Sequence, residues 1–142
     1  MRLTLVAFVG VIICATVTIA GSAKITAIVT DDPASGKSKT SFESDVPQLY
    51  FLFQIRGLKS GDQIRCVWIA IDVGDAADPN TQVDDRTLTA NGDSDDGEFS
   101  VSKPTDGWPV GKYKVDLYVN DELATSIKFT VIAAKSMKSE GG

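Results

Sequence analysis

The chain has 142 residues, with 14 Lys and Arg, 19 Asp and Glu and no histidine, which gives a formal net charge of −5. The negative charge argues against nucleic acid and anionic membrane surfaces as partners, because both recruit basic patches. The lack of histidine removes most general-base and transition-metal schemes. At this length we expect one ordinary domain.

Residues 1–23 have the layout of a secretory signal peptide, with an early positive charge at Arg2, a long apolar stretch and small residues at the end. Cleavage after Ala20 or after Ala23 would satisfy the small-residue rule, and both sites stay open. A membrane anchor is the competing interpretation, since about 17–20 apolar residues can span a bilayer. Cys14 also allows a lipid anchor. This is the minority alternative, because the residues before Cys14 match a bacterial lipoprotein signal poorly. We therefore expect a secreted, periplasmic or extracellular protein that touches the membrane only if this segment is uncleaved.

Removal of residues 1–23 would leave Cys66 as the only cysteine and a net charge of −6. No disulfide can then form within the mature domain, so its core alone must hold it, which is feasible at roughly 120 residues. Cys66 lies in the apolar run QIRCVWIAI and is predicted to be a buried small hydrophobe. A cysteine nucleophile would normally need a histidine base, which the chain lacks.

From Lys24 onward the sequence predicts short strands separated by turn residues, and no window shows helical periodicity. The strand that contains Cys66 is apolar on both faces, so it is predicted to be central or covered. A Gly-, Pro- and Ser-rich loop follows the first strand, and a long acidic, loop-like region surrounds a weaker strand at 81–90. The predicted strands are 24–30, 48–57, 63–74, 81–90, 97–103, 112–120 and 123–132.

The last two strands form a predicted hairpin around Asn120-Asp121-Glu122. The alternation in the first of them places Tyr113, Val115, Leu117 and Val119 inward and Lys112, Lys114, Asp116 and Tyr118 outward. In the second, Leu123, Ile127, Phe129 and Val131 share the inner face. Residues 133–142 are predicted to be a frayed polar tail. About seven such strands over residues 24–132 predict an all-β fold, a two-sheet antiparallel sandwich or a small barrel.

The segment before the hairpin combines bulk with restricted backbone. Pro104 and Pro109 limit the chain on both sides of Trp108, while Gly107 and Gly111 permit turns that other residues resist. We therefore predict a crossover between the two sheets, with Trp108 closing one end of the core.

Trp68 in a central strand, Tyr113 at the start of a late strand and the closing run Phe129-Thr130-Val131 resemble an immunoglobulin-like or fibronectin type III-like sandwich. The resemblance implies that Tyr113 is the tyrosine-corner residue and that Trp68, Trp108, Tyr113 and Phe129 belong to the core. Over 104–131 the chain more narrowly resembles the closing hairpin of Ig-like domains in exported bacterial proteins. The missing disulfide rules out an antibody-type domain and favours the disulfide-free branches. Because such folds host many activities, the resemblance says little about function.

The region from Asp72 to Glu98 holds nine carboxylates and, as its single cation, Arg86. Calcium prefers about six to eight oxygen ligands, which close acidic loops can supply. The EF-hand pattern is not met. In a loop counted from Asn91, the sixth position, which requires glycine, is Asp96, and the twelfth, which requires a bidentate glutamate, is Ser102. The candidate calcium ligands are Asp93, Asp95, Asp96 and Glu98.

Two other interpretations of these acidic residues are open. A site shared between two loops would combine Asp72, Asp75 and Asp78 with Asp93 and Asp95. The favoured interpretation is a solvated hairpin loop, in which Asn-Gly and Asp-Gly steps form turns.

The first functional hypothesis is a secreted, non-catalytic Ig-like domain that contacts another exported or cell-surface protein through its loops or an open sheet edge. The alternative is a calcium- or carbohydrate-binding module that uses the acidic loops in 72–98. Tyr118 and Tyr50 are outward aromatic candidates for sugar stacking. We expect neither an enzyme nor a cofactor, because the sequence shows no phosphate-binding loop and no nucleophile elbow.

Overall fold

The computed structural model describes residues 24–134, so the predicted signal segment and most of the predicted tail lie outside the described residues. Within this part of the chain there are eight strands and a short 3₁₀ helix, Gly74–Ala76, and no helix there has the length and apolar character needed to cross a membrane. The strands are β1 (Lys24–Thr30), β2 (Ser41–Glu43), β3 (Gln48–Arg56), β4 (Gln63–Asp72), β5 (Thr81–Thr89), β6 (Ser94–Ser102), β7 (Gly111–Val119) and β8 (Glu122–Ile132).

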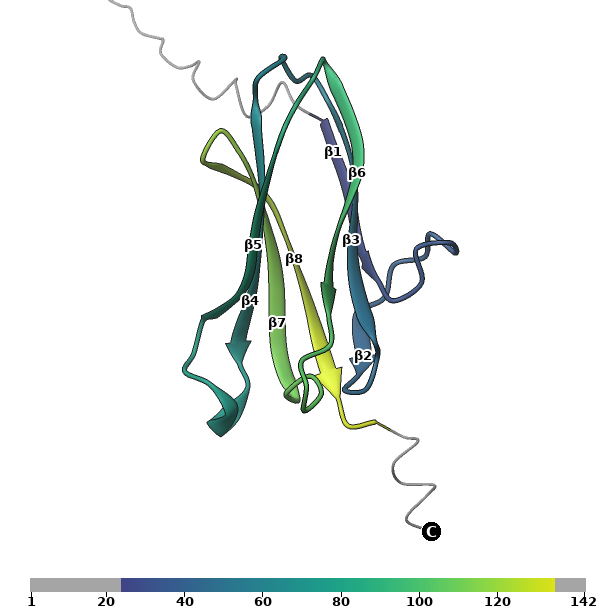
Figure 1. The fold of residues 1–142 in the computed structure, drawn as a ribbon, viewed down its shortest axis with the longest axis vertical. Helices are drawn as coiled ribbons and strands as arrows, with labels where there is room; N and C mark the ends of the chain where they lie inside the picture. Colours follow the sequence, from purple (N-terminus) through teal and green to yellow (C-terminus); the bar gives the residue numbers. More distant parts are fainter. Residues whose placement is uncertain (1–23, 135–142) are drawn as a thin grey trace, which may run out of the picture.

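The strands form two sheets that pack face to face (Figure 1). One sheet has the order β1-β3-β6, and the other has the order β2-β8-β7-β4-β5. All pairs are antiparallel except β2 with β8, which is parallel. The chain leaves the first sheet after β1 and joins the second at β2. The fold is therefore the all-β, two-sheet Ig-like sandwich that the sequence predicts, with one strand more than expected.

The additional strand, β2, lies at the end of the polar loop that follows β1. Its single buried side chain, Phe42, meets the ring of Phe129 edge to face, with 5.6 Å between ring centroids. Three residues are too few to show a two-residue period, so alternation could not reveal this strand.

The acidic stretch before Phe99 is also a strand, so the prediction of a solvated hairpin loop there is wrong. Strand β6 begins at Ser94 and pairs with β3 along its whole length, with Asp95 opposite Ile55 and Asp96 opposite Gln54. Acidic residues are depleted in strands in general, but β6 is an edge strand of its sheet and its outer side chains meet water.

A row of aromatic side chains from β4, β8, β7 and the β6–β7 connection lies in the core. The rings of Trp68 and Phe129 meet edge to face at 6.1 Å, Phe129 stacks on Tyr113 at 5.2 Å, and Tyr113 meets Trp108 at 6.1 Å. All four side chains are buried. Cys66 lies in the same core, where burial raises the pKa of its thiol, as expected for a structural cysteine.

The connection from β6 to β7 crosses between the sheets as predicted, and three hydrogen bonds fix it. The Trp108 backbone N–H donates to the Ser44 carbonyl at 2.9 Å, and its indole N–H donates to the Val46 carbonyl at 3.1 Å. The Tyr113 hydroxyl donates to the Pro109 carbonyl at 2.6 Å, which is the geometry of a tyrosine corner. Both aromatic residues therefore attach the crossover to the sandwich.

The closing hairpin turns at Asn120 and Asp121, whose φ angles of 50° and 69° give the primed turn that suits a two-residue loop. A bulge follows, so Leu123 pairs with Tyr118 on the outer face and is 56% exposed. Its predicted inward orientation is therefore wrong, because the one-residue shift reverses the side of the sheet. Asp116 points outward as predicted, yet it is only 3% exposed.

We expect Tyr113→Phe to lower the free energy of unfolding by about 1–2 kcal/mol at neutral pH, since it leaves the Pro109 carbonyl without its partner. Urea unfolding of residues 24–142 measures this change. Tyr118→Phe is the matched control, because no hydrogen bond holds the Tyr118 hydroxyl in the described residues, and it should change stability by less than about 0.5 kcal/mol.

Burial also makes this contribution depend on pH. It raises the pKa of Tyr113 to about 12, so the unfolded chain, with an ordinary tyrosine pKa of about 10, loses the phenolic proton first. The stability is thus complete below pH about 10 and decreases toward pH about 12. The difference between wild type and Tyr113→Phe should shrink over that window. A constant difference, or equal stabilities at neutral pH, would show that the hydroxyl does not act in this way.

Candidate functional site

The outer face of the three-stranded sheet carries two rows of side chains that run across β1, β3 and β6. They arise because the three strands pair in register and alternate residues of each strand point outward. The first row is Thr26, Gln54 and Asp96, and the second is Ile28, Leu52 and Glu98. Each row therefore ends in a carboxylate on the edge strand β6.

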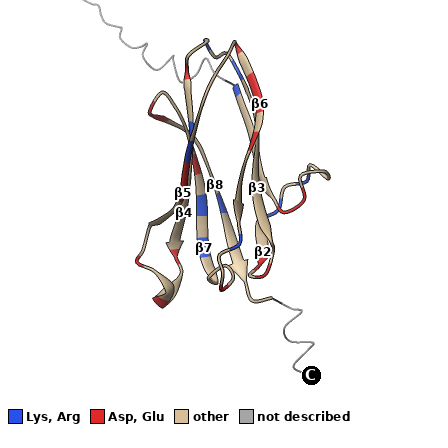
Figure 2. Cartoon of the chain, viewed as in Figure 1, with Lys and Arg blue, Asp and Glu red and all other residues tan. Residues whose placement is uncertain are grey.

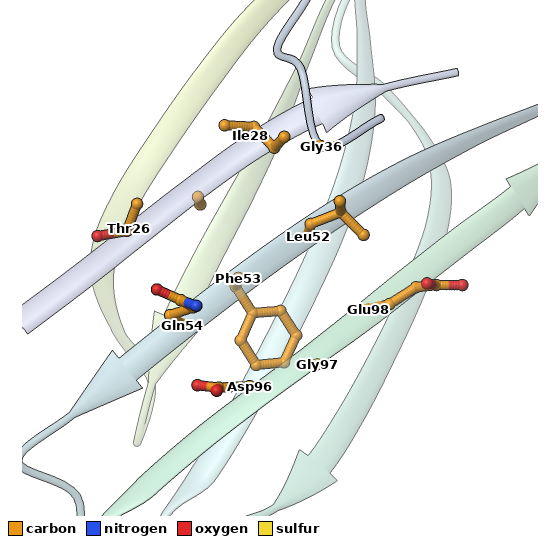
Figure 3. Close-up of a pocket in the computed structure, with 10 residues that line it drawn as sticks. Thr26, Ile28, Gly36, Leu52, Phe53, Gln54, Asp96, Gly97 and Glu98 are labelled. Carbon is orange, nitrogen blue, oxygen red and sulfur yellow. The ribbon is translucent and has the colours of Figure 1, made fainter. Parts of the chain in front are cut away.

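These rows line a hollow of about 610 Å³ (Figure 3). Ile28 and Leu52 are half-buried and form its apolar floor, and Gly36, in the loop after β1, borders it. Gly97 lies opposite Phe53, and a Cβ atom at position 97 would lie 2.7 Å from the ring of that phenylalanine. The lack of a side chain at Gly97 thus lets the Phe53 ring extend beneath β6.

The two carboxylates of the hollow differ in their partners. The Arg56 guanidinium donates to Asp96 Oδ1 at 2.6 Å, and this hydrogen bond raises the pKa of Arg56. Both partners are exposed, so the pair contributes little to stability. Glu98 makes no hydrogen bond or ion pair with the described residues, which leaves one uncompensated negative charge at the rim.

The predicted calcium ligands are spread along β6 rather than gathered. Asp96 and Glu98 point to the outer face, whereas Asp95 pairs with Ile55 on the inner side. Asp93 precedes the strand, and its backbone carbonyl accepts the N–H groups of Gly57 and Leu58 at 2.9 Å. Within residues 24–134 no three Asp, Glu or Cys side chains form a group that could hold a metal ion. The calcium site stays a prediction without a preformed ligand cluster.

The alternative of a site shared between two loops is wrong. Asp72, Asp75 and Asp78 lie at the end of β4, and Asp93 lies beyond the far end of β5. Strand β5 runs antiparallel to β4 for nine residues, roughly 30 Å, between the two groups. Locally, Asp72 accepts the backbone N–H of Gly74 at 3.2 Å, so its carboxylate serves its own turn.

The two tyrosines considered for sugar stacking lie on opposite sheets. Tyr50 shares the outer face of β3 with Leu52, and its hydroxyl donates to Gln48 Oε1 at 3.2 Å. Tyr118 lies on the outer face of the five-stranded sheet. The Arg65 guanidinium carbon is 5.7 Å from the centroid of the Tyr118 ring, and Asp85 holds this guanidinium through two hydrogen bonds of 2.9 and 2.7 Å. The same contact lowers the pKa of Asp85. One face of the Tyr118 ring is therefore already occupied by a fixed cation.

Sequence reasoning found the two carboxylates of the hollow and missed its floor. The signal was present, because Leu52 is an apolar residue at an outward position of the alternating strand 48–57. Ile28 had a weaker signal, since 24–30 is rich in β-branched residues on both faces. Only the pairing of β1, β3 and β6 shows that these residues are neighbours.

No family model and no curated protein matches this chain. Among solved structures, an alkylpurine DNA glycosylase from Pseudomonas fluorescens bound to DNA with an abasic site analog is similar, with 15% identity and a TM-score of 0.51 over 79% of this chain and 31% of that one. A β-glucosidase from Erythrobacter marinus is similar with 13% identity and a TM-score of 0.51 over 78% and 15%. An immunoglobulin-like protein from Pseudomonas aeruginosa has 10% identity and a TM-score of 0.42 over 77% and 92%.

The likeness to the glycosylase and the glucosidase shows a shared fold alone, because the identities are low. This chain spans less than a third of either protein, so the similarity is to one portion of a larger chain.

We expect the thermal unfolding midpoint of residues 24–142 to be the same in millimolar calcium as in the presence of a chelator, because the carboxylates of the described residues do not converge on one point. An ion that bound only the folded state would raise the midpoint by mass action. A rise that is lost in the Asp96→Asn, Glu98→Gln double variant would contradict this expectation and support the calcium-binding alternative.

Proposed function

We propose that this chain is an exported, non-catalytic Ig-like domain that binds another exported or cell-surface protein. The docking surface is the β6 edge together with the hollow beside it. The observation that carries the proposal is a nine-residue edge strand that adjoins a hollow with an apolar floor and an acidic rim.

The edge itself supplies the first element of recognition. Within the described residues, β6 pairs with β3 on one side and with no strand on the other. An edge strand presents unpaired N–H and C=O groups, to which an extended segment of another protein can add as a further strand. Such an added strand would place alternate side chains on the same outer face as the hollow.

Charge supplies the second element. The residues Asp93, Asp95, Asp96 and Glu98 all lie on or immediately before β6 (Figure 2). Two copies of this edge would repel each other, because like charges face each other across the new pair. A basic segment would instead be attracted, and one of its positive side chains would pair with the uncompensated Glu98 carboxylate. The proposed partner therefore presents an extended basic segment.

The hollow supplies the third element. Ile28 and Leu52 offer half-buried apolar surface that an aliphatic or aromatic side chain of the partner can cover. Its lining holds carboxylates, an amide and a hydroxyl, but no pair of nucleophile and base that would support covalent catalysis. This lining favours binding over reaction.

The test is affinity capture by tagged residues 24–142 from the extracellular fraction of the source organism. We compare the wild type with a Leu52→Lys, Glu98→Lys variant, which places two positive charges in the hollow. The matched control is Leu123→Lys, Glu122→Lys, which makes the same chemical changes on the exposed closing hairpin. Circular dichroism and urea unfolding first establish that all three proteins fold.

We expect one captured protein to bind wild type and control equally and to bind the hollow variant at least about tenfold more weakly, since a charge reversal and a lost apolar contact are each worth about 1 kcal/mol. Capture must also weaken as salt increases. Equal capture by both variants, or no extracellular protein that binds the wild type, would overturn the proposal.

A further inference from the structure

The outer face of the five-stranded sheet carries three lysines that lie close together. Lys114 on β7 and Lys128 on β8 are directly opposite each other, and Lys112 lies two residues along the same face of β7. Like charges that face each other across two strands destabilise a sheet. Stability alone would therefore not favour this arrangement of lysines. It also contrasts with the net charge of the chain, which is −5.

The neighbouring carboxylates neutralise one of these three lysines. Asp116, which is almost fully buried, forms an ion pair with the Lys114 ammonium at 3.3 Å and also accepts the Ser126 hydroxyl at 2.6 Å. Asp72 is in register with Lys112, yet its carboxylate accepts a backbone N–H in its own turn. Lys112 and Lys128 form no ion pair with the described residues, so two exposed positive charges remain.

A hollow of about 590 Å³ lies beside these two lysines. Hydroxyl groups line it from the short strand β2 and its approach, Ile71 contributes an apolar wall, and no carboxylate side chain lines it. Its lining includes Thr40, Ser41, Ile71, Lys112, Lys128 and Thr130. The lining therefore combines ammonium groups with hydroxyls that can donate, a set that suits carboxylate groups.

We propose that this hollow is a second docking surface, which takes an acidic peptide segment of a partner protein. Carboxylates of the segment pair with Lys112 and Lys128, the hydroxyls donate to the same carboxylates or to the peptide backbone, and aliphatic carbons of the segment cover Ile71. The surface lies on the opposite layer of the sandwich from the acidic edge strand β6 (Figure 2). It is independent of the first docking surface and can exist without it.

The experiment titrates residues 24–142 into a fluorescently labelled oligoglutamate peptide and follows fluorescence anisotropy at low and physiological salt. The test variant is Lys112→Gln, Lys128→Gln. The matched control, Lys24→Gln, Lys59→Gln, removes the same charge from two exposed lysines outside the hollow. A labelled oligodeoxynucleotide of similar charge serves as a second probe.

We expect the test variant to bind oligoglutamate about tenfold more weakly than the wild type and the control to bind it as the wild type does, because two exposed ion pairs are lost only in the first. Equal weakening in both variants would mean that net charge alone acts. Equal affinity for the oligonucleotide would mean an unselective polyanion surface. Either result, or no binding of oligoglutamate at low salt, overturns this proposal and leaves the β6 surface untouched.

Discussion

The whole structure depends on the attachment of the β6–β7 crossover to the core. Trp108 and Tyr113 are buried next to each other, and their polar atoms donate to the carbonyls of Val46 and Pro109. Through Phe129 this pair reaches Trp68, so the aromatic contacts extend from one end of the core to its centre. With Cys66 as the sole described cysteine, such packing must do what a disulfide does in antibody domains.

Within residues 24–134, a core closed in this way leaves the outer faces of both sheets uncovered. The register of β3 with β1 and β6 fixes the rows that make the acidic hollow, and the register of β7 with β8 sets Lys114 against Lys128. The two candidate surfaces carry opposite charge on opposite layers. Taken together, the two proposals describe a domain that joins a basic segment of one partner to an acidic segment of another, with each contact resting on its own residues.

Period-two patterning was enough to predict an all-β fold, a sandwich or a small barrel, because strands such as 112–120 alternate cleanly around a buried face. The choice of the sandwich rested on the resemblance carried by Trp68 and Tyr113. The patterning failed where a strand was too short, as with Phe42 in β2, or acidic, as with Asp95 in β6. It also failed at Leu123, because a bulge is a property of two paired strands and not of one sequence segment. The candidate site was predicted only through its carboxylates, since neighbours across strands depend on pairing that no single segment encodes.

The most direct test of the central claim is the free energy of unfolding of Trp108→Ala in residues 24–142, measured in urea with reductant present. We expect a loss of about 3–5 kcal/mol, or failure to fold, because the substitution empties one end of the core and frees the Val46 carbonyl. Leu123→Ala, at an exposed position, should change little. A Trp108→Ala protein as stable as the wild type would contradict the claim that the crossover holds the two sheets together.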